Sequence, residues 1–283
     1  MKKKILALVV ATLMIVSCVF GLTGCSTNAV YDKTLYVYTN AGFAPYEYID
    51  TYGQVVGVDM DIMQEIGEVL GYNVVINDID FNQILDEVQN NKFAVGAAGM
   101  TKTDARDAIA LSSISYATSV QYVIAAKGTF TADDLTDGKL SLSKLEELSN
   151  KGLGVQAGTT GDFMITDAVN GYEGDDGNHV EGELENKGFA VTTYTNAIVA
   201  SQDIGTSLGA VVIDKLPAES ICAANDNLEC YQLDAEPEAY VLYFNLEATE
   251  LVEAVNAVLE KMISGGVIDF YTLKHSGGIV SAD

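Results

Sequence analysis

Arg106 is the only arginine in the chain, whereas lysine occurs fourteen times. A guanidinium is a planar fork that binds a carboxylate through two hydrogen bonds, which lysine cannot do. Residues 93–98 form an apolar run that ends at Gly99, and Thr103 is placed to cap a helix whose first turn holds Arg106. A helix start after a strand end favours an anion. The pattern predicts carboxylate binding, the alternative being an ion pair with Asp104 or Asp107.

Alternating strands and helices must position this arginine. Residues 35–38, 73–76 and 93–98 are predicted strands, and residues 82–90 carry apolar residues at helical spacing. Residues 60–70 present apolar side chains on one helical face, and Gly71 is a natural C-cap. This order predicts a mainly parallel sheet with helices on both faces.

The same pattern returns in the second half of the chain. A strand at residues 153–155 runs into Gly158-Thr159-Thr160 and a helix. A helix at 195–201, a strand at 210–213 and a helix opened by Pro217 follow, and residues 251–262 form a final amphipathic helix. We therefore expect two α/β lobes, the first closed by the C-terminal helix. The crossing strands are expected at residues 122–126 and near Ala235.

The N-terminus predicts export. Residues 2–4 are lysines, residues 5–20 are largely apolar, and Leu22-Thr23-Gly24-Cys25 resembles a bacterial lipobox. That resemblance implies lipidation of Cys25, and an uncleaved membrane anchor is the alternative. The expected organisation is a signal peptide at 1–24, a lipid anchor and tether at 25–33, lobe 1 at 34–123, lobe 2 at 124–234 and the end of lobe 1 at 235–283.

The net charge argues against one class of binding partner, and the cysteine content leaves two redox states open. A net charge of −25 argues against sequence-independent binding of nucleic acid, which needs clustered lysine and arginine. Cys222 and Cys230 either form a disulfide or stay reduced.

Residues 171–186 are predicted to form a solvated acidic loop. The alternative there is calcium binding, for which the available oxygen ligands are Asp175, Asp176, Asn178 and Glu181.

Several motifs occur in order along the chain and carry a family resemblance. The segment from Gly99 to Arg106 resembles the G-M-T-x-T-x-x-R signature of the polar-amino-acid solute-binding proteins of ABC importers. Phe43-Ala44-Pro45-Tyr46, Gly57-Val58-Asp59-Met60-Asp61, Gly158-Thr159-Thr160 and the Val211–Ala218 segment also fit. The resemblance implies a type II periplasmic-binding-protein fold.

The resemblance also implies roles for individual residues. Arg106 and Thr101 would hold the α-carboxylate of a ligand, and Thr160 would meet it from lobe 2. The Gly99 carbonyl would accept a hydrogen bond from the α-ammonium. Phe43 and Phe81 would form walls of the pocket, with ordinary core packing as the alternative for each.

Two departures from the family pattern bear on the ligand. Gly209 stands where we expect an aspartate that pairs with the α-ammonium, and a desolvated ammonium without a counter-charge is costly. Asp162 is the first candidate to replace it. Asn40 stands where binders of basic amino acids carry an acid, which favours a neutral or polar ligand side chain.

The expected function is capture of an amino acid or related carboxylate by hinge closure, followed by delivery to an ABC permease and its ATPase. The protein is expected to be a monomer that is lipid-anchored outside the cytoplasm, with no cofactor and no metal. A cyclohexadienyl-dehydratase-like enzyme and a ligand-sensing module are the rivals. His179 and His275 are the only histidines, and neither falls at a predicted strand end, so both are expected at the surface.

Overall fold

The computed structural model describes residues 33–277. Residues 33–277 belong to one compact unit. The predicted leader, Cys25 and nearly all of the tether therefore lie outside the described residues. Among residues 33–277, no helix combines the length and the apolar character that crossing a bilayer requires.

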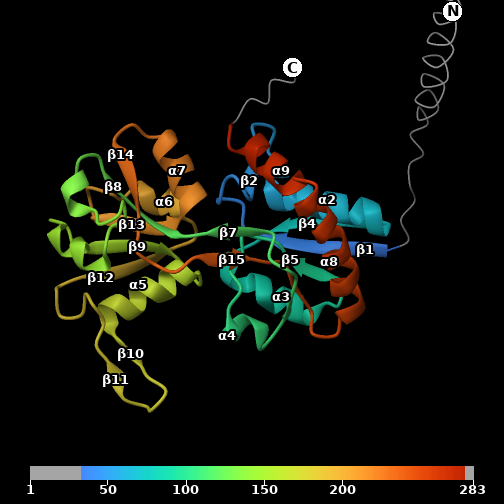
Figure 1. Cartoon of the computed structure of the whole chain (residues 1–283), viewed down its shortest axis with the longest axis horizontal. Coiled ribbons are helices and arrows are strands. Elements are labelled where there is room, and N and C mark those ends of the chain that lie inside the picture. The colour runs from blue at the N-terminus through green and yellow to red at the C-terminus, as the bar shows by residue number, and fades with distance from the viewer. Residues whose placement is uncertain (1–32, 278–283) are drawn as a thin grey trace, which may run out of the picture. The chain divides into compact units, whose positions relative to one another are not determined.

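Lobe 1 is built on a five-stranded sheet in the order β4-β1-β5-β16-β6 (Figure 1). Its strands are β1 (Lys33–Thr39), β4 (Tyr72–Asp78), β5 (Ala94–Gly96), β6 (Leu111–Ser112) and β16 (Tyr243–Phe244). Its helices are α2 (Val58–Leu70), α3 (Ile84–Asn90), α4 (Asp104–Asp107), α8 (Thr249–Ser264) and α9 (Val267–His275). A hairpin of β2 (Tyr48–Ile49) and β3 (Val55–Val56) and the short helix η1 (Phe81–Gln83) complete it.

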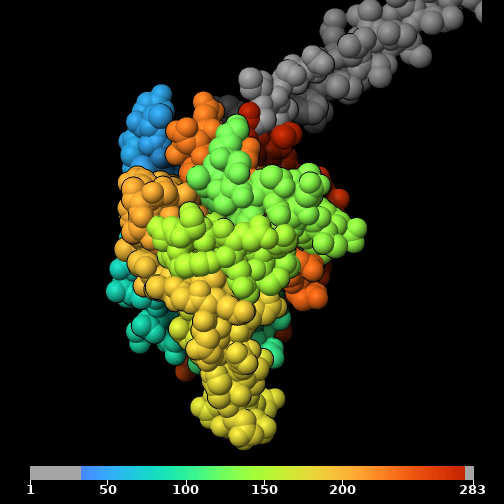
Figure 2. Space-filling model, turned by 90° about the vertical axis from the view of Figure 1, so that its left-hand side faces the viewer, coloured from blue at the N-terminus to red at the C-terminus, as the bar shows by residue number. Residues whose placement is uncertain are grey.

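Lobe 2 is built on a second five-stranded sheet in the order β12-β9-β13-β8-β14. Its strands are β8 (Gln121–Ala126), β9 (Gly152–Gln156), β12 (Ala190–Tyr194), β13 (Ala210–Asp214) and β14 (Leu228–Gln232). Its helices are η2 (Ala132–Asp134), η3 (Leu142–Glu147), α5 (Thr160–Asn170), α6 (Ala197–Ser201) and α7 (Lys215–Ala223). The hairpin β10 (Tyr172–Glu173) and β11 (His179–Val180) projects from this lobe (Figures 1 and 2).

Local sequence explains the predicted elements. In α2, the residues Ile62, Met63 and Ile66 are fully buried because they share one helical face, and Gly71 ends the helix in the left-handed conformation. In β13, every residue from Ala210 to Asp214 is buried, which fits a strand covered on both faces. The two-lobed α/β fold predicted from the sequence is confirmed.

The structure corrects four details of that prediction. Both sheets are mixed rather than mainly parallel, since β16 runs antiparallel to β5 and β8 runs antiparallel to β13. The crossing pair is β7 (Ala117–Ser119) with β15 (Glu238–Tyr240), whereas residues 122–126 lie inside the second sheet. A further helix, α9, follows α8. The acidic insertion contains the β10–β11 hairpin, which the sequence analysis read as a loop.

Candidate functional site

A cleft with about 290 Å³ of empty space, part of it open to solvent, lies between residues of the two lobes, close to the crossing strands; it is called the cavity below. Its lining residues are Phe43, Glu47, Phe81, Ala98, Gly99, Thr101, Arg106, Gln156, Thr159, Thr160 and Asp214. Six of the eight residues expected to touch a ligand are in this set. The other two, Asn40 and Asp162, are not.

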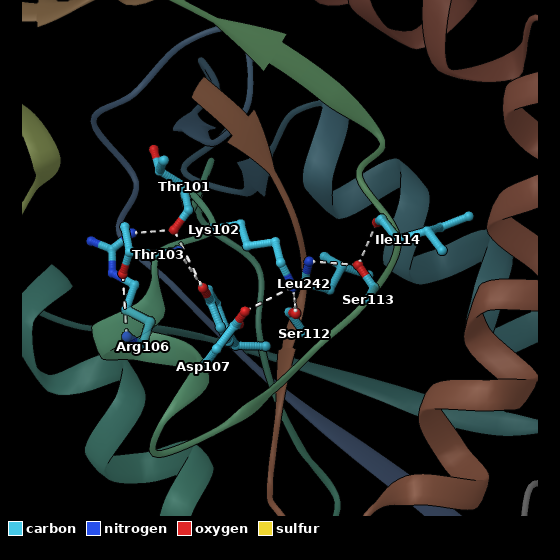
Figure 3. A network of polar contacts seen from close by, with 10 residues as sticks. Thr101, Lys102, Thr103, Arg106, Asp107, Ser112, Ser113, Ile114 and Leu242 are labelled. Atoms are coloured by element: carbon cyan, nitrogen blue, oxygen red, sulfur yellow. Dashed lines mark hydrogen bonds and ion pairs between the residues drawn. The ribbon is translucent and has the colours of Figure 1, made fainter. Parts of the chain in front are cut away.

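Arg106 reaches this cavity from a short helix. The Thr103 hydroxyl caps α4 by accepting the Arg106 amide at 3.2 Å, as the sequence predicted. The Arg106 side chain then donates from Nη1 to the Thr101 carbonyl at 2.7 Å, and Figure 3 shows both contacts. From Nη2 it donates across to the Gly158 carbonyl of lobe 2 at 3.1 Å. The guanidinium is thereby oriented by backbone groups of both lobes.

No carboxylate among residues 33–277 forms an ion pair with Arg106. The alternative of an ion pair within its own helix is therefore wrong, because Asp107 pairs with Lys102 at 2.8 Å instead. Arg106 is only 7% exposed, and burial lowers the pKa of its guanidinium. Its Cζ lies 5.4 Å from the ring centre of Phe81, which shields one face. A buried cation held by carbonyls alone is suited to receive an anion.

Two buried acids, Glu47 and Asp214, line the same cavity without any ion-pair partner among the described residues. Glu47 is 1% exposed, and its Oε2 atom is buried with no hydrogen-bond partner. Asp214 is 4% exposed and accepts the Tyr240 hydroxyl at 2.6 Å and Gln121 Nε2 at 3.2 Å. The sequence analysis selected neither acid. The available signal was Asp214 at the carboxyl end of a buried strand, the usual ligand edge.

Burial decides the titration of these acids. Loss of solvent raises the pKa of Glu47 well above its usual range, and the neighbouring charges of Asp59 and Asp214 raise it further. Burial followed by the charge of Glu238 raises the pKa of Asp214 to about 7. Both acids would therefore be strongly stabilised in their charged forms by a cation placed in the cavity.

The glycine at position 209 has a packing explanation. Gly209 precedes β13, whereas Asp214 ends that strand at the cavity. A Cβ at position 209 would lie 2.0 Å from the Asn150 carbonyl oxygen, so no side chain fits there. Gly209 therefore does not leave the cavity without an acid, because Asp214 lies at the other end of β13 and lines the cavity.

Asp162 and Asn40 make structural hydrogen bonds. The Asp162 carboxylate accepts the Gly158 amide at 2.9 Å and the Thr166 hydroxyl at 3.1 Å, which fixes the turn into α5. It therefore lies outside the cavity lining and is not placed to replace a missing acid. Asn40 donates to the Ile79 carbonyl at 2.7 Å and accepts Gln156 Nε2 at 3.0 Å, which joins the two lobes.

Both threonine hydroxyls expected to assist Arg106 are engaged elsewhere. Thr101 Oγ1 and Thr160 Oγ1 donate to the same atom, Oε2 of Glu238, at 2.5 Å and 2.7 Å. Thr160 is the first residue of α5, where the helix leaves backbone N–H groups without intrahelical partners. These amides are therefore available to donate to an anion at this end of the cavity.

Gly99 is required by the shape of the cavity. Its φ of +53° is in the left-handed region, and a Cβ would lie 2.6 Å from Cε1 of Phe43. The Gly99 amide donates to Asp59 Oδ2 at 2.8 Å, which secures the turn between β5 and α4. The aromatic wall and the arginine turn are thus packed directly against each other.

Comparison with known proteins identifies the family. Residues 35–277 match the model of the bacterial extracellular solute-binding proteins, family 3. The chain belongs to that family. The arginine-binding extracellular protein ArtP of Bacillus subtilis (strain 168) is 24% identical over 95% of this chain and 96% of its own length.

Solved structures agree with this assignment. An ancestral arginine-binding protein bound to arginine is 27% identical, with a TM-score of 0.71 over 88% of this chain and 100% of that chain. An ancestral arginine-binding protein bound to glutamine is 28% identical, with a TM-score of 0.70 over 87% of this chain and 98% of that chain. The predicted family, extracytoplasmic solute-binding role and non-enzymatic class are confirmed.

The structure also bears on the expected calcium ligands, cysteines and histidines. No cluster of three or more histidine, cysteine, aspartate or glutamate residues within 33–277 is arranged to hold a metal ion, so the calcium alternative gains no support. Cys222 and Cys230 are free thiols in α7 and β14. His179 is exposed as expected, whereas the side chain of His275 is only 6% exposed. His275 bonds with Asp61 at 2.8 Å and with the Tyr48 hydroxyl at 3.0 Å.

Proposed function

We propose that this protein captures arginine, or a close basic relative, for import by an ABC permease and its ATPase. The proposal is carried by one observation: the cavity holds a buried guanidinium without an acid partner and two buried acids without a cation partner. A basic amino acid supplies one carboxylate and two cations, which matches this set of charges. The names of the relatives point to the same ligand.

The backbone of the ligand would bind at the Arg106 end. Arg106 would take the α-carboxylate through its remaining N–H donors, since a guanidinium has five and carbonyls occupy two. The N-terminus of α5 would add amide donors to the same anion. The α-ammonium would pair with Asp214, which lies at the end of β13 in the same cavity.

The side chain of the ligand would bind at the Glu47 end. Glu47 Oε2 and Gln156 Oε1 are both buried acceptor atoms without a partner. Unpaired buried acceptors are costly, so a guanidinium that donates to them would recover that cost. Phe43 would cover the aliphatic part of the ligand. This assignment replaces the expectation of a neutral side chain that was based on Asn40.

The surrounding steps are part of the same proposal. A ligand that touches Arg106 in lobe 1 and the α5 terminus in lobe 2 binds the closed form best, so it shifts the population towards closure. The closed protein would then dock on the permease. Lipidation of Cys25 would keep the monomer at the outer face of the membrane, where the permease is located.

A thermal-shift screen of amino acids tests the proposal directly. A ligand that binds only the folded state raises the melting temperature by mass action, so arginine should give the largest shift. Arg106→Ala should abolish that shift while leaving a cooperative melt. Arg106→Lys should retain only a small part of it, because lysine cannot bind a carboxylate bidentately.

Two outcomes would redirect the assignment. A larger shift with glutamine than with arginine would mean that the side-chain end of the cavity is neutral in effect. An unchanged arginine shift in Arg106→Ala would place the ligand elsewhere.

A further inference from the structure

Glu238 joins three separate segments through its carboxylate. Its Oε2 atom accepts the hydroxyls of Thr101 from lobe 1 and Thr160 from lobe 2, at 2.5 Å and 2.7 Å. Its Oε1 atom accepts Gln121 Nε2 at 2.9 Å. Glu238 itself is the first residue of β15, one of the two crossing strands. A single side chain at the hinge therefore contacts both lobes.

The two threonine hydrogen bonds to Glu238 respond differently when the lobes separate. Thr101 forms a β-bridge with Tyr240, two residues after Glu238, so Thr101 is tied to the crossing strand by the backbone as well. Thr160 lies at the start of α5, and its hydroxyl donates a hydrogen bond to Glu238. When the lobes separate, the Thr160 hydrogen bond must break, together with the Arg106–Gly158 and Gln156–Asn40 bonds that also join the lobes.

These bonds join protein groups only and involve no ligand atom. Hydrogen bonds to a charged acceptor are the stronger ones in proteins, and two hydroxyls on one carboxylate oxygen satisfy it well. Glu238 also lies outside the set of residues that line the cavity, although its charge raises the pKa of Asp214 there. It therefore acts on ligand binding through lobe closure and through this charge, not through direct contact with the ligand.

We propose that Glu238 is a closure latch: a positioning residue whose carboxylate binds Thr160 of lobe 2 and so stabilises the closed form independently of the ligand. The latch slows opening and thereby ligand release. The hydroxyl of Thr160 consequently acts through Glu238, and the ligand carboxylate is left to Arg106 and the backbone amides. This last point rests on the proposed function, whereas the closure effect does not.

Small-angle scattering of the ligand-free full chain tests the latch without reference to any ligand. Glu238→Ala should increase the radius of gyration relative to the parent, because a larger fraction of molecules is open. Glu238→Gln keeps the size and one acceptor oxygen, so its value should lie between the two. Glu236→Ala is the matched control, since Glu236 is exposed on the same segment and should leave the radius unchanged.

Stopped-flow measurements with arginine supply the second readout. Glu238→Ala should raise the dissociation rate about tenfold, the scale of one hydrogen bond to a charged group, and change the association rate less than twofold. Thr160→Val should have a similar effect alone. In the double variant the two effects should not add, because each removes the same bond.

The outcomes separate this latch from the proposed function. If Glu238→Ala leaves both the radius and the arginine dissociation rate unchanged, the latch does not exist. If Thr160→Val raises the arginine dissociation rate equally with and without Glu238, Thr160 contacts the ligand itself and the latch is wrong. If arginine fails to bind the parent, the radius comparison alone decides the latch. A melting temperature for each variant identifies any that fail to fold.

Discussion

At the scale of single residues, the cavity is defined by charges that have no partner of their own. Arg106 is oriented by two carbonyls, Asp214 accepts two neutral donors, and Glu47 is buried with its Oε2 atom unpartnered. Such a set is costly in an empty site and is stabilised by a ligand with complementary charges. Substitutions at Glu47 and Asp214 are therefore expected to change ligand selectivity and the pH dependence of binding more than they change folding.

Glu47→Gln should change selectivity. The substitution removes a buried negative charge whose Oε2 atom has no partner, so arginine should lose affinity by at least about tenfold. Glutamine, which carries no side-chain charge, should lose little. Calorimetric titration with both amino acids measures the ratio. An equal loss for both ligands would mean that Glu47 supports the fold of the site rather than the guanidinium.

Asp214 should make arginine binding depend on pH. Its pKa is raised to about 7 in the folded, ligand-free protein, above the ordinary value for an aspartate. The folded state therefore binds a proton that the unfolded state has lost, and ligand-free stability should fall as pH rises from about 4 through 7. A bound ammonium favours the ionised carboxylate, so affinity should rise over the same interval with release of a proton.

Titrations in buffers of different ionisation enthalpy measure that proton release. Asp214→Asn should bind arginine weakly and should show neither the proton release nor the pH dependence of stability that Asp214 contributes. Asp162→Asn serves as a comparison on lobe 2, since that carboxylate lies outside the cavity lining. A proton release as large in Asp214→Asn as in the parent would assign it to another buried acid, with Glu47 the first candidate because its pKa is also raised.

At the scale of elements, the first turns of α4 and α5 position two of the cavity residues, Arg106 and Thr160. Thr103 caps α4 and sets Arg106, and Thr159 caps α5 and sets the turn that carries Gly158 and Thr160. The Thr103 cap is a local pattern, so the position of Arg106 could be predicted from it, whereas Thr160 was expected from the family resemblance. Glu47 and Asp214 could not be selected in the same way, because their role depends on two distant segments that meet only in the folded chain.

Thr159→Ala should destabilise the protein by about 1 kcal/mol, the usual cost of losing a helix N-cap. Thr159 accepts the Asp162 amide at 3.1 Å and donates to the Gln156 carbonyl at 2.9 Å. The same change should weaken arginine binding several-fold, because the α5 terminus loses its fixed position. Thr159→Ser should recover both properties. Urea denaturation gives the free energy of unfolding, and identical curves for parent and Thr159→Ala would contradict this account.

The same scale explains the errors in the predicted fold. Residues 122–126 are apolar and strand-like, so sequence alone could not decide whether they cross between lobes or join a sheet. The register settles the matter, because β8 pairs with both β13 and β14. His275 was expected at the surface because no pattern relates it to Tyr48 and Asp61, which lie more than 200 residues away in the chain.

At the scale of the whole molecule, the charge of −25 should influence how a ligand arrives. A negative field attracts a cationic ligand at low ionic strength, and salt screens that attraction over about 10 Å at 0.1 M. We expect the association rate of arginine to fall several-fold between about 20 mM and 0.5 M sodium chloride, with a nearly constant dissociation rate. Stopped-flow mixing separates the two rates, and a salt effect confined to dissociation would argue against steering.

The path of the chain through lobe 2 has a consequence for how such proteins diversify. The segment enters this sheet at β8 and leaves it at β14, and these two strands are hydrogen-bonded neighbours from Tyr122↔Gln232 to Ala126↔Leu228. The ends of the inserted half therefore meet side by side at the crossing strands. Recombination between homologous genes at these two points would exchange one wall of the cavity as a cassette, while Arg106 and its sheet stay in place.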